Sequence, residues 1–182
     1  MKPDFELTTS RLLFRPYKSA DLHALFDAVK TSIPQLSPWL SWCTESYDHD
    51  DAYAWINASR NNWQNDISYE LAIFDRQSLQ FIGAISLNNL SEQLNCAELG
   101  YWIKTDSQRQ GFATEACKAI AKFAFSTLGL TRLEIVVHTG NLASQRTALA
   151  CRAQFECTAR NKIYTSGCAY NGLVFSLIPS DL

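Results

Sequence analysis

Three strand-like segments follow one another closely in the middle of the chain, at 68–75, 80–89 and 96–104. Each alternates apolar with other residues, which is the pattern of a strand that buries one face. The connections between them are short, whereas a parallel pair needs a crossover of about a dozen residues or more. The sequence therefore predicts an antiparallel meander, and the rest of the fold has to be built around it.

The remaining segments add helices and strands on both sides of this meander. Strand-like segments lie at 6–15, 132–139, 154–163 and 169–178, and helix-like segments lie at 21–31, 48–63, 112–128 and 141–151. Pro34 and Pro38 interrupt the chain between the first two helices. The predicted order is β-α-α-β-β-β-α-β-α-β-β. This indicates an α+β fold, a single domain over 1–182 with a mixed, mostly antiparallel sheet of about seven strands and about four helices.

The composition narrows the functional class. The net charge of −2 over 182 residues gives no basic face for DNA or RNA. No segment approaches the ~20 apolar residues of a membrane span, and the N-terminus lacks the apolar core of a signal peptide. The six cysteines are scattered without zinc-site spacing, so they are expected to be reduced thiols rather than metal ligands. We therefore expect a cytoplasmic protein that binds no nucleic acid, membrane or metal.

Residues 105–116, TDSQRQGFATEA, join the third strand of the meander to a helix. A helix N-terminus presents unpaired N–H groups and a partial positive charge, so it can hold an anion. Gly111 has no Cβ to obstruct a phosphate, and Ala113 keeps the same approach clear. Arg109 can add a charge-assisted contact, and Gln108 can brace the loop. The phosphate motifs GxxxxGKS/T and GxGxxG are absent, which argues against nucleotide hydrolysis and against a dinucleotide-binding dehydrogenase.

The spacing Gln108-x-x-Gly111-x-Ala113, after a strand and at the start of a helix, resembles the acetyl-coenzyme A loop of GNAT-type N-acetyltransferases. Four segments, TTSRLLFRPYKSADL, AELGYWI, GFATEA and GNLASQR, resemble in the right order the Rim class of this superfamily, the ribosomal-protein N-terminal acetyltransferases. The resemblance extends across nearly the whole chain. It implies a GNAT-like domain, acetyl-coenzyme A as cosubstrate without a metal, and the N-terminal α-amine of a protein, such as a ribosomal protein, as acetyl acceptor.

The resemblance also assigns residues to acetyl-coenzyme A. The phosphates are expected at the loop and first helical turn, at Gln108, Arg109, Gln110, Gly111, Phe112 and Ala113. The pantetheine arm is expected at the backbone of Trp102, Ile103 and Lys104 and at Asn141 and Ser144. Backbone N–H groups of that strand can also polarise the acetyl carbonyl. Asn141 can equally be the N-cap of its helix.

Three residues are candidates for the chemistry. Ser144 stands three residues after Asn141, where its hydroxyl can donate a hydrogen bond to the departing thiolate; the alternative is a surface serine near a cap. Glu98 can act as a base through water, or it is an exposed glutamate on the opposite side of the sheet from Leu99 and Tyr101. Tyr101 can reach the substrate, although most strand tyrosines are packing residues.

Trp39 and Trp42 are candidate contacts of the acceptor, in the region that walls the acceptor cleft in relatives. His138 ends a strand near the expected site and is more simply interpreted as a solvated histidine.

Two positions depart from the Rim pattern. Arg152 stands where a glycine is usual, and no carboxylate stands near Ile163, where some members place a catalytic glutamate. The general base is therefore left unassigned.

Two alternative functions stay open. The same chemistry can serve a small amine, such as an antibiotic or a polyamine. The missing strand glutamate also keeps open a module that binds the cofactor without catalysis. A scaffold of this kind hosts many acceptors, so the fold does not select one. The sequence leaves open whether the protein forms a homodimer.

Overall fold

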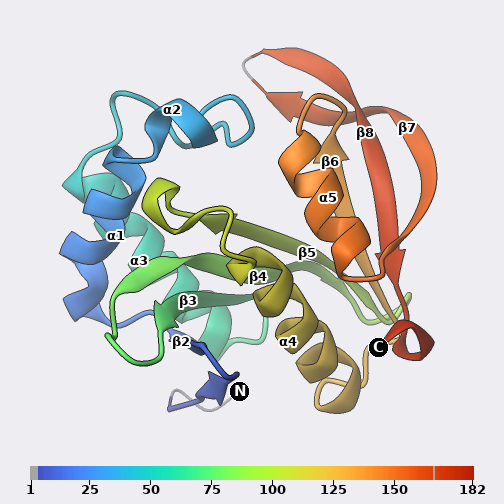
Figure 1. Cartoon of the computed structure of the whole chain (residues 1–182), viewed down its shortest axis with the longest axis horizontal. Helices are drawn as coiled ribbons and strands as arrows, with labels where there is room; N and C mark the ends of the chain where they lie inside the picture. Colours follow the sequence, from blue (N-terminus) through green and yellow to red (C-terminus); the bar gives the residue numbers. More distant parts are fainter. Residues whose placement is uncertain (1–3, 166) are drawn as a thin grey trace.

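The computed structural model describes residues 4–165 and 167–182. Within these residues, eight strands form one sheet in the order β1-β2-β3-β4-β5-β6-β8-β7 (Figure 1). The strands are β1 Leu7–Thr8, β2 Leu12–Pro16, β3 Tyr69–Asp75, β4 Phe81–Ser91, β5 Cys96–Ile103, β6 Arg132–His138, β7 Gln154–Thr165 and β8 Cys168–Leu177. The helices are α1 Leu22–Lys30, α2 Ile33–Leu36, α3 His49–Gln64, α4 Phe112–Ser126 and α5 Leu142–Ala150.

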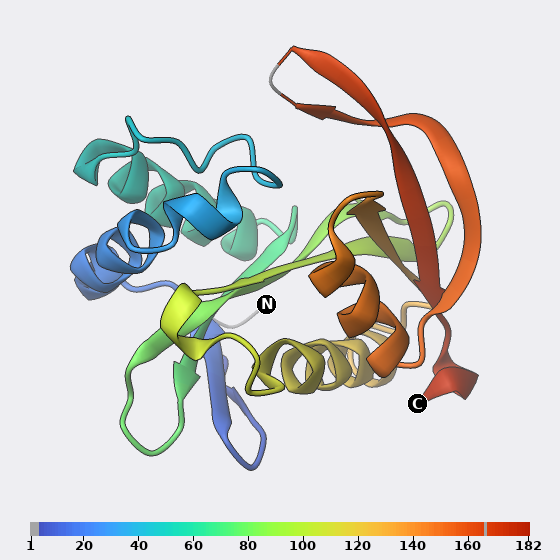
Figure 2. The same ribbon diagram turned by 45° about the horizontal axis from the view of Figure 1, so that its top comes forward.

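All neighbouring strands are antiparallel except β5 and β6, which are parallel. The α+β class is confirmed, and β3, β4 and β5 form the predicted meander. The sheet separates two groups of helices, with α1, α2 and α3 on one face and α4 on the other, beside α5 (Figure 2). Cys117 and Ile120 of α4 belong to the same core as Leu71 of β3. Val29 of α1 packs in the opposite core with Ala72, the next residue of β3, as the two-residue period of a strand requires.

The segment predicted as one strand at 6–15 is divided into β1 and β2 by a tight turn. Thr9 donates its N–H to the carbonyl of Leu12 (2.9 Å), and its Oγ1 accepts the N–H of Leu12 (2.9 Å). Thr9 Oγ1 also donates to Glu115 Oε1 of α4 over 2.6 Å. This contact comes from a helix distant in sequence. The prediction of a continuous strand was wrong because alternation along the chain carries no information about such a partner.

Two helix starts follow from their local residues. α2 is a single short helix that holds Pro34 in its first turn, where a missing N–H breaks no intrahelical hydrogen bond. α3 begins after Asp48, whose carboxylate accepts the N–H groups of Asp50 (2.9 Å) and Asp51 (3.0 Å). The helix start predicted at Asp48 is confirmed.

β5 and β6 separate toward their C-terminal ends. Over the part of the chain that the structure describes, β5 pairs with β6 only at 96–98, although β5 continues to Ile103. β6 pairs with β8 from Leu133 to His138. The later part of β5 therefore has one edge without a strand partner.

Gly83 of β4 lies where the backbones of β4 and β5 approach each other closely. A Cβ on Gly83 would be 2.2 Å from the carbonyl oxygen of Trp102 and 2.9 Å from the Cα of Ile103. Real Cβ atoms do not make contacts this short, so a larger residue would push the two strands apart. Glycine at this position therefore allows the C-terminal end of β5, at the end of its free edge, to lie this close to β4.

α5 ends in a left-handed residue, Arg152, with a φ of 70°. The N–H of Ala153 donates to the carbonyl of Ala148 (3.0 Å), and the N–H of Arg152 donates to that of Leu149 (2.9 Å). These two bonds are the Schellman motif, in which glycine is the usual left-handed residue. The backbone at 152 thus has the conformation that favours glycine, although the residue is arginine.

Candidate active site

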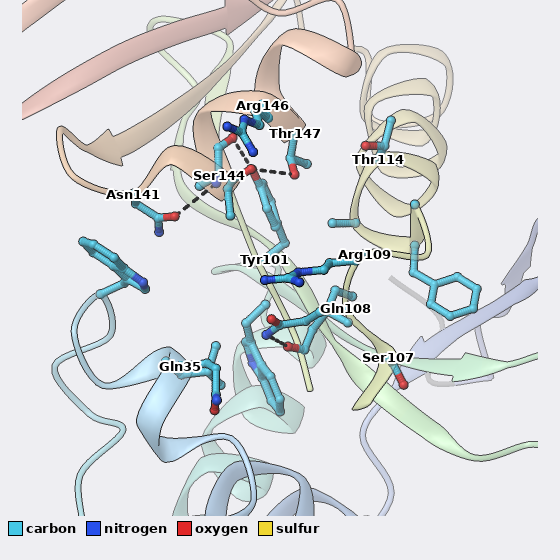
Figure 3. Close-up of a pocket in the computed structure, with 18 of the residues that line it drawn as sticks. Gln35, Tyr101, Ser107, Gln108, Arg109, Thr114, Asn141, Ser144, Arg146 and Thr147 are labelled. Carbon is cyan, nitrogen blue, oxygen red and sulfur yellow. Dashed lines mark hydrogen bonds between the residues drawn. The ribbon is translucent and has the colours of Figure 1, made fainter. Parts of the chain in front are cut away.

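A cavity of about 460 Å³ lies beside the free edge of β5, between α2, the start of α4 and the start of α5 (Figure 3). The residues predicted from sequence that line it are Trp39, Tyr101, Trp102, Ile103, Gln108, Arg109, Gly111, Phe112, Ala113, Asn141 and Ser144. Among the described residues, Trp42, Glu98, Lys104 and Gln110 are outside this lining. Segments far apart in the sequence thus meet at one site.

The loop between β5 and α4 carries two left-handed residues, Arg109 (φ 60°) and Gly111 (φ 80°). Gly111 is the N-cap of α4, and no side chain of the described residues caps the helix there. The N–H groups of Phe112, Ala113 and Thr114 therefore have no intrahelical acceptor, and all three residues line the cavity. Open donors at a helix N-terminus suit a phosphate group.

Three side chains extend this anion-binding character. Gln108 braces the loop, because its Nε2 donates to the carbonyl of Ile103 over 2.9 Å. Figure 3 shows Arg109 pointing into the cavity from the loop and Arg146 lying on α5 close to Ser144. Arg109 and Arg146 are exposed, so their guanidinium groups can move to meet a ligand. The cavity can therefore hold an anion that carries several charges.

Only alternate residues of β5 turn their backbone groups toward the cavity. Lys104 donates its N–H to β4 over 2.8 Å, and Trp102 has the same orientation because it lies two residues earlier. Tyr101 and Ile103 therefore direct their N–H and C=O groups to the free edge. The expectation that the backbones of Trp102 and Lys104 are available is corrected: the backbone groups of Trp102 and the N–H of Lys104 face β4, and the carbonyl of Lys104 accepts the N–H of Ser107 (3.0 Å).

Asn141, Ser144 and Tyr101 form one hydrogen-bonded chain at the α5 side of the cavity (Figure 3). Asn141 is the N-cap of α5, and its Oδ1 accepts the N–H of Ser144 over 3.1 Å. The hydroxyl of Tyr101 donates to the carbonyl of Ser144 (3.1 Å) and lies 2.9 Å from Ser144 Oγ, so in this arrangement Ser144 Oγ is the donor of the hydroxyl pair. Three residues that the sequence indicated separately are thus in contact.

The hydroxyl of Tyr101 stays protonated in this chain. Burial raises the pKa of Tyr101 well above its ordinary value, because the phenolate would lose its solvation. Tyr101 is therefore a neutral hydrogen-bond donor at physiological pH. It can pass a proton toward Ser144, but it does not serve as a ready base.

Glu98 lies on the other face of the sheet. It belongs to the part of β5 that still pairs with β6, next to Glu134, and it accepts a hydrogen bond from Asn89 Nδ2 over 3.1 Å. Alternation along β5 directs it away from Leu99 and Tyr101. Of the two interpretations of Glu98, the structure shows the glutamate on the opposite side of the sheet from Tyr101.

The two predicted acceptor tryptophans lie in different surroundings. Trp39 lines the cavity, and its ring centroid lies 5.4 Å from that of His138 at the end of β6. Trp42 packs edge-on against Trp102, with 6.1 Å between ring centroids. His138 Nδ1 accepts the N–H of Gly140 over 3.0 Å, so a neutral imidazole carries its proton on Nε2. In this tautomer the Nε2–H of His138 is a hydrogen-bond donor.

Other residues of the site were not predicted from the sequence. Thr147 and Thr114 both line the cavity. Thr147 lies three residues after Ser144, on the same face of α5, and Thr114 comes directly after the loop motif, so both could have been predicted from their spacing to residues already identified. Arg11 contacts the start of α4 through Glu115, which lies 104 residues later. Nothing in the local sequence around Arg11 indicates this contact.

The described residues, 4–165 and 167–182, contain no group of three or more His, Cys, Asp or Glu side chains that could hold a metal ion. They also contain no helix with the length and apolar character that crossing a membrane requires. The six cysteines, all of them described, are free thiols. The polar groups that line the cavity include backbone and side-chain amides, hydroxyls and guanidinium groups, and they lie beside apolar side chains such as Trp39, Leu40 and Phe112.

A strand edge without a partner, an uncapped helix N-terminus and a pair of hydroxyls border one cavity. Residues 11–154 match the acetyltransferase (GNAT) domain family. This match covers well over half of the chain, and the chain belongs to the GNAT family of acetyltransferases. It is an enzyme that uses acetyl-coenzyme A as cosubstrate.

Similar proteins agree with this family. A Vibrio cholerae protein described as a proposed ribosomal-protein-serine acetyltransferase is 37% identical, covers 98% of this chain and 100% of its own, and superposes with a TM-score of 0.89. The uncharacterized N-acetyltransferase YoaA of Bacillus subtilis (strain 168) is 29% identical over 173 residues, 94% of this chain and 96% of YoaA. RimL, a ribosomal L7/L12 α-N-protein acetyltransferase solved with coenzyme A, is 19% identical over 94% of this chain and 96% of its own and shares the fold (TM-score 0.86). The resemblance to the Rim class is confirmed.

Proposed function

We propose that this acetyltransferase modifies the N-terminal α-amine of a protein, and that a ribosomal protein is its substrate. The observation that carries this proposal is the 37% identity, over 98% of the chain, to a protein described as a proposed ribosomal-protein-serine acetyltransferase. Six free thiols fit the cytoplasm, the compartment in which ribosomal proteins are made.

The proposed complex uses the cavity along its whole length. The phosphates of acetyl-coenzyme A bind the open N–H groups at the start of α4, with Arg109 and Arg146 as cationic partners. The pantetheine arm lies along the free edge of β5, where Tyr101 offers its N–H and C=O groups and Ile103 offers its N–H, as a neighbouring strand would; the carbonyl of Ile103 already accepts a hydrogen bond from Gln108. This arrangement brings the thioester to Ser144 on α5.

The chemistry that we propose is direct transfer. The amine nitrogen attacks the thioester carbonyl carbon, and the C–S bond breaks when the tetrahedral intermediate collapses. The N–H of Ile103 is a candidate to stabilise the oxyanion. Ser144 Oγ gives its proton to the departing thiolate, and Tyr101 replaces that proton. The amine proton leaves through water, which restores the hydroxyl of Tyr101.

A strong base is not required in this scheme. An α-amine has a pKa near 8, so roughly a tenth of it is neutral at pH 7 without help from the protein. This proposal therefore does not need Glu98 or His138, and it accounts for activity without a carboxylate near Ile163. Trp39, which lines the cavity next to His138, and Trp42 are the proposed contacts of the acceptor chain.

The test is a panel of acceptors with purified protein and acetyl-coenzyme A. Peptides that begin with Ser or Ala should release free thiol, and mass spectrometry should locate the acetyl group on the α-amine. The same peptides with a blocked N-terminus are the matched control and should be inert. Acetylation of polyamines or aminoglycosides alone, with every α-amine untouched, would contradict the proposed acceptor while leaving the enzyme class intact.

A further inference from the structure

Arg11, in the turn between β1 and β2, contacts the start of α4 at several points outside the cavity. Its Nε and Nη2 lie 2.7 and 2.6 Å from Glu115 Oε2. Its Nη1 donates to the carbonyl of Gln110 over 3.0 Å. The guanidinium carbon lies 4.6 Å from the ring centroid of Phe112, and Nη2 lies 3.5 Å from where a Cβ on Gly111 would be. One side chain therefore holds the loop, the N-cap and the first turns of α4.

Glu115 introduces a negative charge close to the proposed phosphate site. It is the fourth residue of α4, and its Oε1 accepts hydrogen bonds from Thr9 Oγ1 (2.6 Å), Ser10 Oγ (3.3 Å) and Arg11 N (3.2 Å). Burial raises the pKa of Glu115, but the hydrogen bonds from Thr9 and Arg11 outweigh it, so the pKa lies below its ordinary value. Glu115 is therefore ionised at neutral pH, where it opposes a phosphate.

Arg11 changes the charge around the loop. The loop and the first turn of α4, residues 104–115, carry Lys104, Asp106, Arg109 and Glu115, which sum to zero. Arg11, bonded to Glu115, brings the sum to +1. A pyrophosphate at the helix N-terminus is attracted more strongly by a positive surrounding than by a neutral one.

We propose that Arg11 is a positioning residue for the pyrophosphate of acetyl-coenzyme A. It holds Gln110 and Gly111 in the conformation that opens the N–H groups, and it neutralises Glu115. It does both without lining the cavity itself. The N-terminal hairpin is thereby part of the cofactor site. This inference rests on the proposed placement of the phosphates at the start of α4.

The experiment compares Arg11→Gln with a matched control, Arg76→Gln. Arg76 contacts the same turn, through Nη1 to the carbonyl of Thr9 (2.9 Å), and is not among the partners of the loop. Isothermal titration gives the dissociation constant for coenzyme A, and thiol release gives kcat and KM. Each variant is assayed with acetyl-coenzyme A and with S-acetylpantetheine, which has the same thioester but no pyrophosphate.

Arg11→Gln should weaken coenzyme A binding about tenfold and raise the KM for acetyl-coenzyme A, with kcat nearly unchanged. Its kinetics with S-acetylpantetheine should equal those of the wild type, and Arg76→Gln should match the wild type with both substrates. A role limited to folding would lower activity with both thioesters equally and would overturn the inference. An unchanged dissociation constant in Arg11→Gln would also overturn it.

The double variant Arg11→Gln/Glu115→Gln separates charge from geometry. It restores the wild-type net charge around the loop, so it should bind coenzyme A several-fold more tightly than Arg11→Gln alone, and the difference should shrink at high salt. A double variant that binds no better overturns the neutralising role.

If Arg11→Gln does not fold, Arg11→Lys replaces it in the same comparison. Lysine keeps the positive charge but lacks the guanidinium fork that contacts Gln110 and Glu115 together. Arg11→Lys should weaken coenzyme A binding less than Arg11→Gln would, and its kinetics should change with acetyl-coenzyme A but not with S-acetylpantetheine. A wild-type protein that binds no coenzyme A would overturn the phosphate placement and this inference together.

Discussion

The hydroxyl of Tyr101 lies 2.9 Å from Oγ of Ser144, across 43 residues of sequence. Tyr101 comes from the free part of β5, and Ser144 comes from the first turn of α5. The contact therefore joins two of the elements that border the cavity. In the mechanism that we propose, the buried phenol, whose pKa is raised by desolvation, stays protonated and supplies a proton to Ser144 when Ser144 gives one up.

Ser144→Ala and Tyr101→Phe should each lower kcat by about 10–1,000-fold and leave the KM for acetyl-coenzyme A nearly unchanged. The double variant should be little worse than the worse single variant, since the two hydroxyls act in series. Steady-state thiol release measures all three. Ser107→Ala, which changes a hydroxyl elsewhere in the lining, is the control. A rise in KM with an intact kcat would make Ser144 a binding residue instead.

Gly111→Val should weaken coenzyme A binding strongly, because residue 111 needs a φ of 80° that a β-branched side chain does not adopt readily. Overlap with the protein is not the cause, since a Cβ there would make only an ordinary 3.5 Å contact with Arg11. Gly111→Asn, which tolerates the left-handed conformation better, should lose less affinity. Titration with coenzyme A decides, and equal losses in the two variants would contradict this explanation.

Gly83→Ala should destabilise the protein by about 2 kcal/mol or more, because the new Cβ would lie 2.2 Å from a backbone oxygen that cannot move freely. The control is Gly140→Ala, whose Cβ would make ordinary contacts of 3.4 Å or longer. Urea unfolding measures both. Similar stabilities for the two variants would show that β4 and β5 can shift apart at little cost.

Arg152→Gly should stabilise the protein by about 1 kcal/mol, since glycine adopts the left-handed conformation without the strain of an L side chain. Arg152→Ala keeps the strain and should give no gain. Thermal unfolding of the two variants compares them. A gain in Arg152→Ala as large as that in Arg152→Gly would point to the arginine side chain rather than to the backbone.

The pH dependence of stability should contain a contribution from Glu156. Hydrogen bonds from Arg132 and Ser176 lower the pKa of Glu156 from its ordinary value of 4.5 to about 2. The carboxylate therefore stabilises the fold fully above pH 4.5, and this contribution is lost as the pH falls toward 2. The side chain is 38% exposed, so the effect is discounted to about 1 kcal/mol.

Glu156→Gln should accordingly cost that amount at pH 7 and progressively less below pH 4.5. Urea unfolding of the wild type and the variant at a series of pH values gives the difference directly. A difference that stays constant as the pH falls would contradict the assigned ionisation of Glu156.

Local sequence determined much of this protein. The alternation in three close segments predicted the β3–β4–β5 meander, Asp48 predicted a helix start, and Gly111 predicted an open helix N-terminus after β5. Each of these depends on residues within one turn or one strand of each other. The alternation of side chains along a strand, helix capping and the freedom of glycine at positive φ all act over that short range. These features can therefore be predicted from the local sequence.

Only the tertiary structure decided which of these residues share a site. β5 separates from β6 after residue 98 while β6 continues to pair with β8, and this separation leaves Tyr101 at the free edge. The contacts of Thr9 and Arg11 with Glu115 join residues about a hundred positions apart. Such contacts follow from the path of the whole sheet rather than from any local preference, and for that reason the sequence alone did not contain them.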